Sequence, residues 1–191
     1  MSETREKPQG MDASRALVRV FSELTGGTEA SQPGVVLNTG DVGLLQSLEK
    51  LSSEDASQSS AEGATIAAHA QHLRFGLSLM NQWAREGGDP FTGARWDEAW
   101  KISSVDEARW TEIRTGLRHE SVQWREALAS RPPTSTRDLH WMIGSIAHLA
   151  YHLGALRQIH RALRGPRETA SAPSGASAAP AASAPLRWLV R

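Results

Sequence analysis

Long stretches with apolar residues at helical spacing alternate along the chain with short stretches rich in Gly, Pro and Ser. Apolar positions that recur every three or four residues form one face of an amphipathic helix. This spacing predicts helices over residues 11–24, 42–51, 65–85, 104–129 and 138–163. The residues expected on their buried faces include Leu17, Val20, Phe21, Leu24, Ile66, Leu73, Leu77, Met80, Trp83, Trp110, Ile113, Leu117, Trp124, Leu128, Met142, Ile146, Leu149, Leu153 and Leu156.

The ends of these helices carry capping signals. Asp41 is placed to cap the second helix, and Ser104 with Glu107 has the spacing of a capping box before the fourth. The polar residues 52–63 are predicted to form a loop, and residues 94–104 an irregular or briefly helical link.

We find no internal repeat and no alternating strand pattern longer than a few residues. Three long helices and a first segment split in two predict an all-α protein with a four-helix bundle. Residues 1–10 are polar and are expected to be disordered, and residues 11–165 form the predicted domain. Residues 166–191 begin with an Ala/Ser/Pro-rich run that predicts a disordered tail, ending in the apolar and basic LRWLVR.

Composition narrows the classes of function. The 191 residues have a formal net charge of zero, so no basic field favours nucleic acid or an anionic membrane. The chain has no cysteine, which excludes disulfides, zinc fingers and iron–sulfur clusters and leaves His, Asp and Glu as metal ligands. Because no secretory signal or membrane span is visible in the sequence, a cytoplasmic location is expected.

Tryptophan is unusually frequent: the chain has seven, against one tyrosine and three phenylalanines. Large core side chains in a helical protein are the favoured interpretation. A pocket mouth lined by tryptophan is the alternative.

Two histidines, His148 and His152, lie four residues apart in the apolar stretch HLAYHLGALRQIH. Positions four apart on a helix differ by about 40° and about 6 Å of rise, so both rings project from one face. Small residues nearby leave room for a ligand; they are Gly144, Ala147, Ala150 and Gly154. The pair alone leaves three interpretations open: a metal site, two hydrogen-bonded core histidines or two surface histidines.

A second pair, His69 and His72, lies among apolar and small residues of the helix predicted over residues 65–85. One imidazole from this helix, if it packs antiparallel to the last one, completes a three-histidine site. Three neutral imidazoles leave coordination positions of a divalent ion open, as in catalytic sites, whereas closed structural sites use four protein ligands. The two rings lie about 60° apart around the helix, so helical geometry does not choose between them.

The motif IAAHAQHL spans residues 66–73, and AHLAYHLGALRQI spans residues 147–159. Together they resemble the second and last helices of the DinB/YfiT-like metalloenzyme superfamily, and the order of elements is similar over residues 11–165. The resemblance is specific because both helices match. One departure is Ala155, which stands where many members have Gln after the Gly.

The resemblance implies a four-helix bundle of DinB/YfiT-like type with one divalent metal ion. The family's ligand on the second helix is typically the histidine directly before leucine, which corresponds to His72. The other two ligands correspond to His148 and His152. His69 corresponds to a residue that often accompanies the site, as an outer partner or a pocket wall.

Other residues near the motifs have weaker assignments. Arg157 has two interpretations, as a side chain that reaches an anionic substrate above the metal or as a solvated helix arginine. Tyr151 is assigned to the pocket. His119 lies in a polar run and is expected at the surface, while His140 and His160 are expected at helix ends or at the rim of the site.

The function that the resemblance implies is an enzyme with a metal ion held by three histidines. The metal activates either a low-molecular-weight thiol cosubstrate, which is transferred to a small-molecule substrate, or a water molecule, which hydrolyses the substrate. Three histidines suit Zn²⁺ or Ni²⁺, with Fe²⁺ or Mn²⁺ as alternatives. The alternative is a non-catalytic metal-binding or interaction module of the same fold. A homodimer is possible in either case, and no nucleic-acid or membrane partner is expected.

Overall fold

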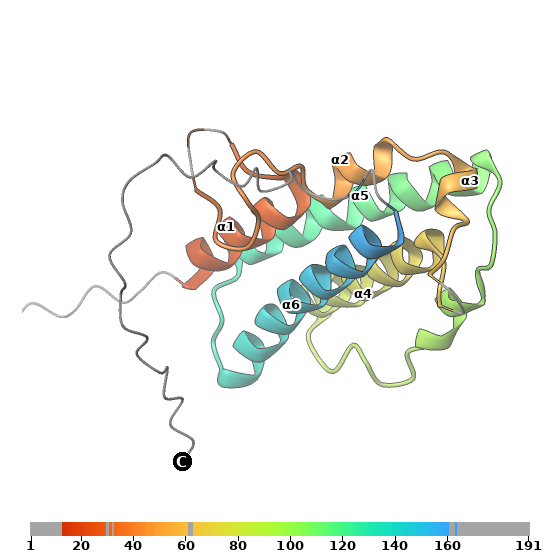
Figure 1. Ribbon diagram of the computed structural model, residues 1–191. Helices are drawn as coiled ribbons and strands as arrows, with labels where there is room; N and C mark the ends of the chain where they lie inside the picture. Colours follow the sequence, from red (N-terminus) through yellow and green to blue (C-terminus); the bar gives the residue numbers. More distant parts are fainter. Residues whose placement is uncertain (1–12, 30, 32, 61–62, 161–162, 164–191) are drawn as a thin grey trace, which may run out of the picture.

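The computed structural model describes residues 13–29, 31, 33–60, 63–160 and 163 (Figure 1). Its helices are α1 (Ala13–Gly26), α2 (Leu44–Glu49), α3 (Ser53–Ala56), α4 (Ile66–Glu86), the 3₁₀ helix η1 (Trp96–Lys101), α5 (Glu107–Ser130) and α6 (Thr136–Ile159). In these residues β-structure is limited to two isolated bridges, which confirms the predicted all-α class. Within the same part of the chain, none of the helices has both the length and the apolarity that crossing a bilayer requires.

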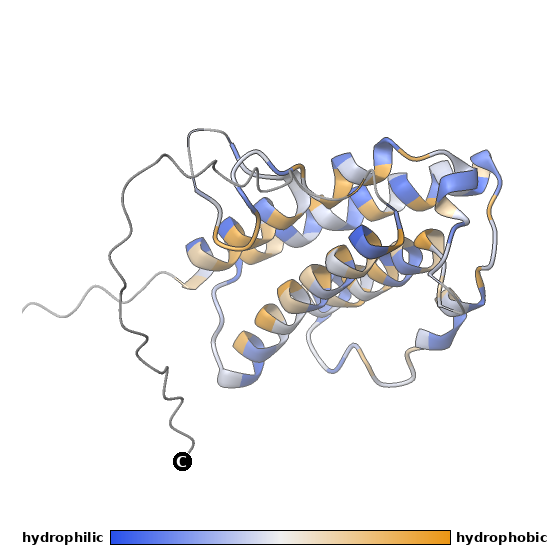
Figure 2. Cartoon of the chain, viewed as in Figure 1, coloured by the Kyte–Doolittle hydropathy of each residue, from blue (hydrophilic) through white to orange (hydrophobic). Residues whose placement is uncertain are grey.

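The four long helices pack around one apolar core. Both α1 and α4 contact α5 and α6, so α1 lies diagonally opposite α4. The predicted apolar faces are buried in this core, except that Val20 and Ile146 are only partly buried and pack against it. Figure 2 shows hydrophobic residues along much of α1 and α6, while α5 carries many hydrophilic positions. Burial of these stripes holds the helices in place, since packing of an apolar face supplies most helix stability in proteins.

The position of the histidines depends on the direction in which α4 runs relative to α5 and α6. On α4 and α6, His69 contacts His152 and His72 contacts His148, so the two helices run antiparallel. Between α4 and α5, Arg74 bonds Glu112, and Asn81, further along α4, bonds Glu120. The residue numbers rise together on both helices, so α4 and α5 run parallel. Parallel neighbours need a long connection, and residues 87–106 with η1 provide it along α4.

Three local predictions at helix starts and loops are wrong. The N-cap of α2 is Gly43 rather than Asp41, whose carboxylate is turned instead toward α6. The loop predicted over residues 52–63 contains the short α3, because Ser52 and Asp55 form a capping box. The N-cap of α5 is Asp106 rather than Ser104, because its carboxylate accepts the Arg109 amide at 2.7 Å.

The last helix also differs from its predicted range of 138–163. It begins two residues earlier, because the hydroxyl of Ser135 accepts the Asp138 amide at 3.1 Å. It ends at Ile159, and the backbone of His160 is extended. The predictions of disorder over residues 1–10 and 166–191, and the segment LRWLVR, lie outside the described residues.

Candidate metal centre

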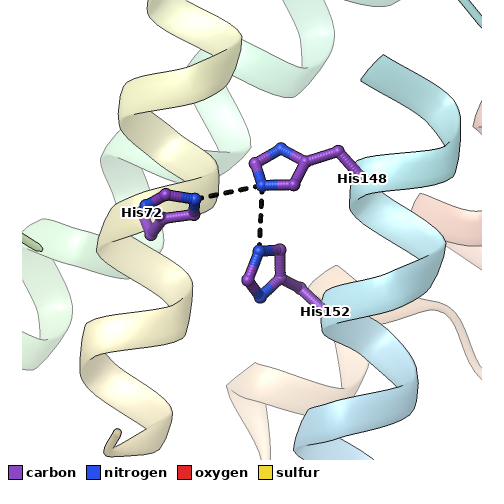
Figure 3. Close-up of side chains that lie close together, drawn as sticks. All are labelled: His72, His148 and His152. Atoms are coloured by element: carbon purple, nitrogen blue, oxygen red, sulfur yellow. Dashed lines mark hydrogen bonds between the residues drawn. The ribbon is translucent and has the colours of Figure 1, made fainter. Parts of the chain in front are cut away.

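Four histidine rings meet between α4 and α6. The antiparallel packing places His69 and His72 of α4 opposite His148 and His152 of α6 (Figure 3 shows the last three). The Nε2 atom of His148 lies 3.0 Å from Nε2 of His72 and 2.9 Å from Nε2 of His152. The ligand nitrogens of these three residues all lie within 4.8 Å of one another, so they are close enough to hold one metal ion.

The contacts among the three rings are difficult to satisfy with protons alone. A neutral imidazole carries one N–H and one lone pair, so each ring presents either a donor or an acceptor at Nε2. The single Nε2 of His148 faces two other Nε2 atoms and offers only one hydrogen or one lone pair between them. A cation bound by three lone pairs satisfies all three nitrogens at once, which is the chemistry of a His₃ site.

His69 lies outside this set of three and contacts one member of it. Its Nδ1 lies 2.8 Å from Nδ1 of His152. If His152 uses Nε2 as a ligand, its Nδ1 carries the proton and donates it to His69. Such outer hydrogen bonds fix the tautomer and orientation of a ligating histidine. His69 therefore lies beside the three rings as a hydrogen-bond partner of His152, and its role as an accompanying residue stays a prediction.

Burial keeps these rings neutral. Burial, followed by the charges of the neighbouring rings, lowers the pKa of His72 to about 4 and that of His152 to about 3. Burial also lowers the pKa values of His69 and His148. Near pH 7 all four rings are therefore neutral, which leaves a lone pair on each for a metal ion or a hydrogen bond.

Two tryptophans of η1 cover the histidines. The ring of Trp100 stacks on His72 with centroids 4.2 Å apart and an interplanar angle of 29°. The ring centroid of Trp96 lies 5.2 Å from that of His72 and 6.2 Å from that of His148. The connection between α4 and α5 therefore places an aromatic wall over the site.

A cavity of about 380 Å³ opens beside the histidines. His72 and His148 lie in its wall, together with residues from both helices and from the connection. The remaining lining residues are Leu73, Gly76, Leu77, Met80, Phe91, Trp96, His140, Trp141, Gly144 and Ser145. This volume lies within the range of about 300–1,000 Å³ typical of small-molecule sites.

Two predicted pocket residues lie elsewhere. The guanidinium of Arg157 donates to the buried carboxylate of Asp41 at 3.1 Å and to the carbonyl of Val42 at 3.3 Å. These contacts join α6 to the segment before α2, so Arg157 is not a solvated helix arginine, and it does not line the cavity. That it reaches an anionic substrate stays a prediction. Tyr151 is exposed and does not line the cavity, although its ring centroid lies 5.1 Å from that of His152 with the rings nearly perpendicular.

The other histidines follow the expectations from the sequence. His119 is exposed on α5 and contacts Gln123. His140 lies at the rim, where it lines the cavity from the first part of α6. His160 lies at the end of α6, 3.2 Å from Asp55.

Tryptophan fills both of the roles considered from the sequence. Trp83, Trp110 and Trp124 are core residues, as favoured. The alternative, a pocket wall, describes Trp96 and Trp141, which line the cavity. The sequence indicated that Trp96 and Trp100 lie in a link, but no pattern along the chain placed that link over α4.

The resemblance to the DinB/YfiT-like superfamily rests on the spacing of the histidines and on the order of the helices, and it stays a prediction. Comparison of the chain with protein-family models, with curated proteins and with solved structures finds no match.

Proposed function

We propose that the chain is a metal-dependent enzyme with a four-helix bundle of DinB/YfiT-like type. In this proposal His72, His148 and His152 hold one divalent ion, Zn²⁺ or Ni²⁺ in preference to Fe²⁺ or Mn²⁺. The observation that carries the proposal is the convergence of three neutral ring nitrogens from two antiparallel helices, with His72 and His152 buried and His148 half-buried.

The residues of the site fit a catalytic ion better than a structural one. Three protein ligands leave coordination positions open, and the cavity reaches two of the three histidines. A divalent ion at such a site lowers the pKa of a thiol or water bound to it, and so supplies a nucleophile at neutral pH.

The chain's own residues orient and shield this chemistry. With Nε2 of His152 as a metal ligand, Nδ1–H of His152 donates a hydrogen bond to Nδ1 of His69, which directs Nε2 of His152 toward the other two rings. Trp100 covers one face of His72 and limits the approach of water from that side. Because the chain contains no cysteine, a thiol that takes part in the reaction comes from a cosubstrate.

Metal-dependent consumption of a thiol tests the proposal. Protein loaded with Zn²⁺ or Ni²⁺ is mixed with low-molecular-weight thiols and the electrophile chlorodinitrobenzene, and loss of free thiol is followed. In this reaction the thiol sulfur bonds to the ring carbon, chloride leaves and the thiol proton passes to water. A parallel panel of 4-nitrophenyl esters tests activation of water. Turnover is expected in one of the panels, and chelator treatment or His148→Ala should remove it.

A protein that binds one metal ion per chain and turns over no member of either panel contradicts the catalytic proposal. That result instead supports the non-catalytic module, in which the ion stabilises the fold because it binds only the folded state.

A further inference from the structure

The cavity beside the histidines has an aromatic wall of its own. Phe91, from the connection after α4, lies between two tryptophans, with its ring centroid 6.0 Å from Trp96 and 5.6 Å from Trp141. Leu77 and Met80 of α4 also line the cavity. Aromatic contacts at such distances hold the rings in fixed relative positions, so this wall is formed before a ligand arrives.

Among the described residues, no Asp, Glu, Lys or Arg borders the cavity. The hydroxyl of Ser145 is already engaged, since it accepts the indole N–H of Trp124 at 3.0 Å and donates to the carbonyl of Met142 at 2.7 Å. The remaining polar groups of the lining side chains are three histidine rings, with His72 and His148 next to the site and His140 at the rim, and the indole N–H groups of Trp96 and Trp141. These groups are hydrogen-bond donors and acceptors rather than permanent ions.

We infer that this cavity binds an uncharged aromatic or branched aliphatic group of the substrate. The metal-binding atom of the same substrate then lies at the end of the cavity that is lined by His72 and His148. A charged group in this position loses its hydration and finds no ion-pair partner, whereas an apolar group gains from burial. The position of the reacting end of the substrate rests on the proposed function. The apolar cavity does not, because its lining is given by the described residues alone.

Two glycines leave space in the cavity, and one of them allows a test. At Gly76 an added Cβ would lie 3.5 Å from both the His148 ring and the Trp96 ring, so a larger side chain there would push on the site. At Gly144 an added Cβ meets nothing within 4 Å. Because Gly144 lines the cavity, Gly144→Leu is expected to add side-chain volume there without a clash at Cβ, and it raises the helix propensity of α6.

Gly154 offers a matched control. It lies on the same helix, does not line the cavity, and an added Cβ there also meets nothing within 4 Å. Gly154→Leu makes the same chemical change outside the cavity.

The first arm of the test uses the Zn²⁺-loaded full chain and two hydroxamates with the same metal-binding head, benzohydroxamate and acetohydroxamate. Isothermal titration calorimetry is expected to give benzohydroxamate an affinity about 10- to 100-fold higher, the gain typical of burying one phenyl group. Gly144→Leu should remove most of this preference while acetohydroxamate still binds, and Gly154→Leu should keep it. Equal affinities of the wild-type protein for the two compounds would overturn the inference.

The second arm needs no metal. Fluorine NMR follows 4-fluorobenzyl alcohol with the metal-free chain, and saturable binding is expected in the wild type and Gly154→Leu but not in Gly144→Leu. Binding that survives unchanged in Gly144→Leu, or no binding to the wild type, overturns the inference. Failure of the wild type to retain Zn²⁺ against a weak chelator contradicts the proposed function instead, and the metal-free arm separates the two failures.

Discussion

Replacing His148 with alanine is expected to abolish stoichiometric binding of a divalent metal ion. The Nε2 atom of His148 is the central one of the three, since it contacts Nε2 of both His72 and His152. Its removal leaves two ligand nitrogens and a wider gap between them. The loss of affinity should exceed the roughly 10–100-fold that removal of an outer hydrogen-bond partner costs. Competition with a calibrated chelator at one pH measures the affinity.

Three further variants extend this result. His119→Ala changes an exposed histidine on α5 and should leave metal affinity unchanged. His69→Ala removes the partner of His152 Nδ1 and should weaken binding by about 10–100-fold without emptying the site. His72→Ala should empty it. If His69→Ala lost more metal affinity than His72→Ala, His69 rather than His72 would be the ligand from α4.

Arg157→Met is expected to destabilise the fold by about 3–5 kcal/mol, the usual cost of breaking a buried ion pair from one side. The Asp41 side chain is 0% exposed, and Arg157 Nη1 lies 3.1 Å from its Oδ2. Methionine keeps much of the aliphatic stem but leaves the carboxylate without that cation. Urea unfolding of the metal-free protein measures the change in free energy.

A double variant, Arg157→Met with Asp41→Leu, provides the control. Replacing both partners by apolar residues should recover much of the lost stability, because no charge is then left buried. Both proteins should still bind one metal ion per chain. A single variant as stable as the wild type, or one that loses metal while keeping its stability, would contradict the structural role of the Arg157–Asp41 pair.

The helices were predictable because their apolar stripes are local signals. Trp110, Ile113 and Leu117, for example, recur at helical spacing and are fully buried. Capping was less predictable, since Ser104 and Asp106 are both good N-caps and only the three-dimensional path of the connection selects one. At Asp41, a tertiary contact with Arg157 replaced the local capping role that the sequence favoured.

The convergence of the histidines was predictable for a similar reason. His148 and His152 share one helix face by spacing alone, and antiparallel packing of α4 then brings His72 to them. The aromatic wall was not predictable in the same way. Trp96, Trp100 and Phe91 lie in a connection with no periodic pattern, and their position over α4 depends on a crossover between parallel helices.

Binding of one divalent ion by three histidines is tested most directly by the metal content of the full chain, purified without an affinity tag. Mass-spectrometric elemental analysis after dialysis should find one divalent ion per chain, as Zn²⁺ or Ni²⁺ in preference to Fe²⁺ or Mn²⁺. After removal by a chelator, added Zn²⁺ should return to the same stoichiometry in the wild type and not in His148→Ala. A wild-type protein that carries no such metal and takes up no Zn²⁺ would contradict the metal site.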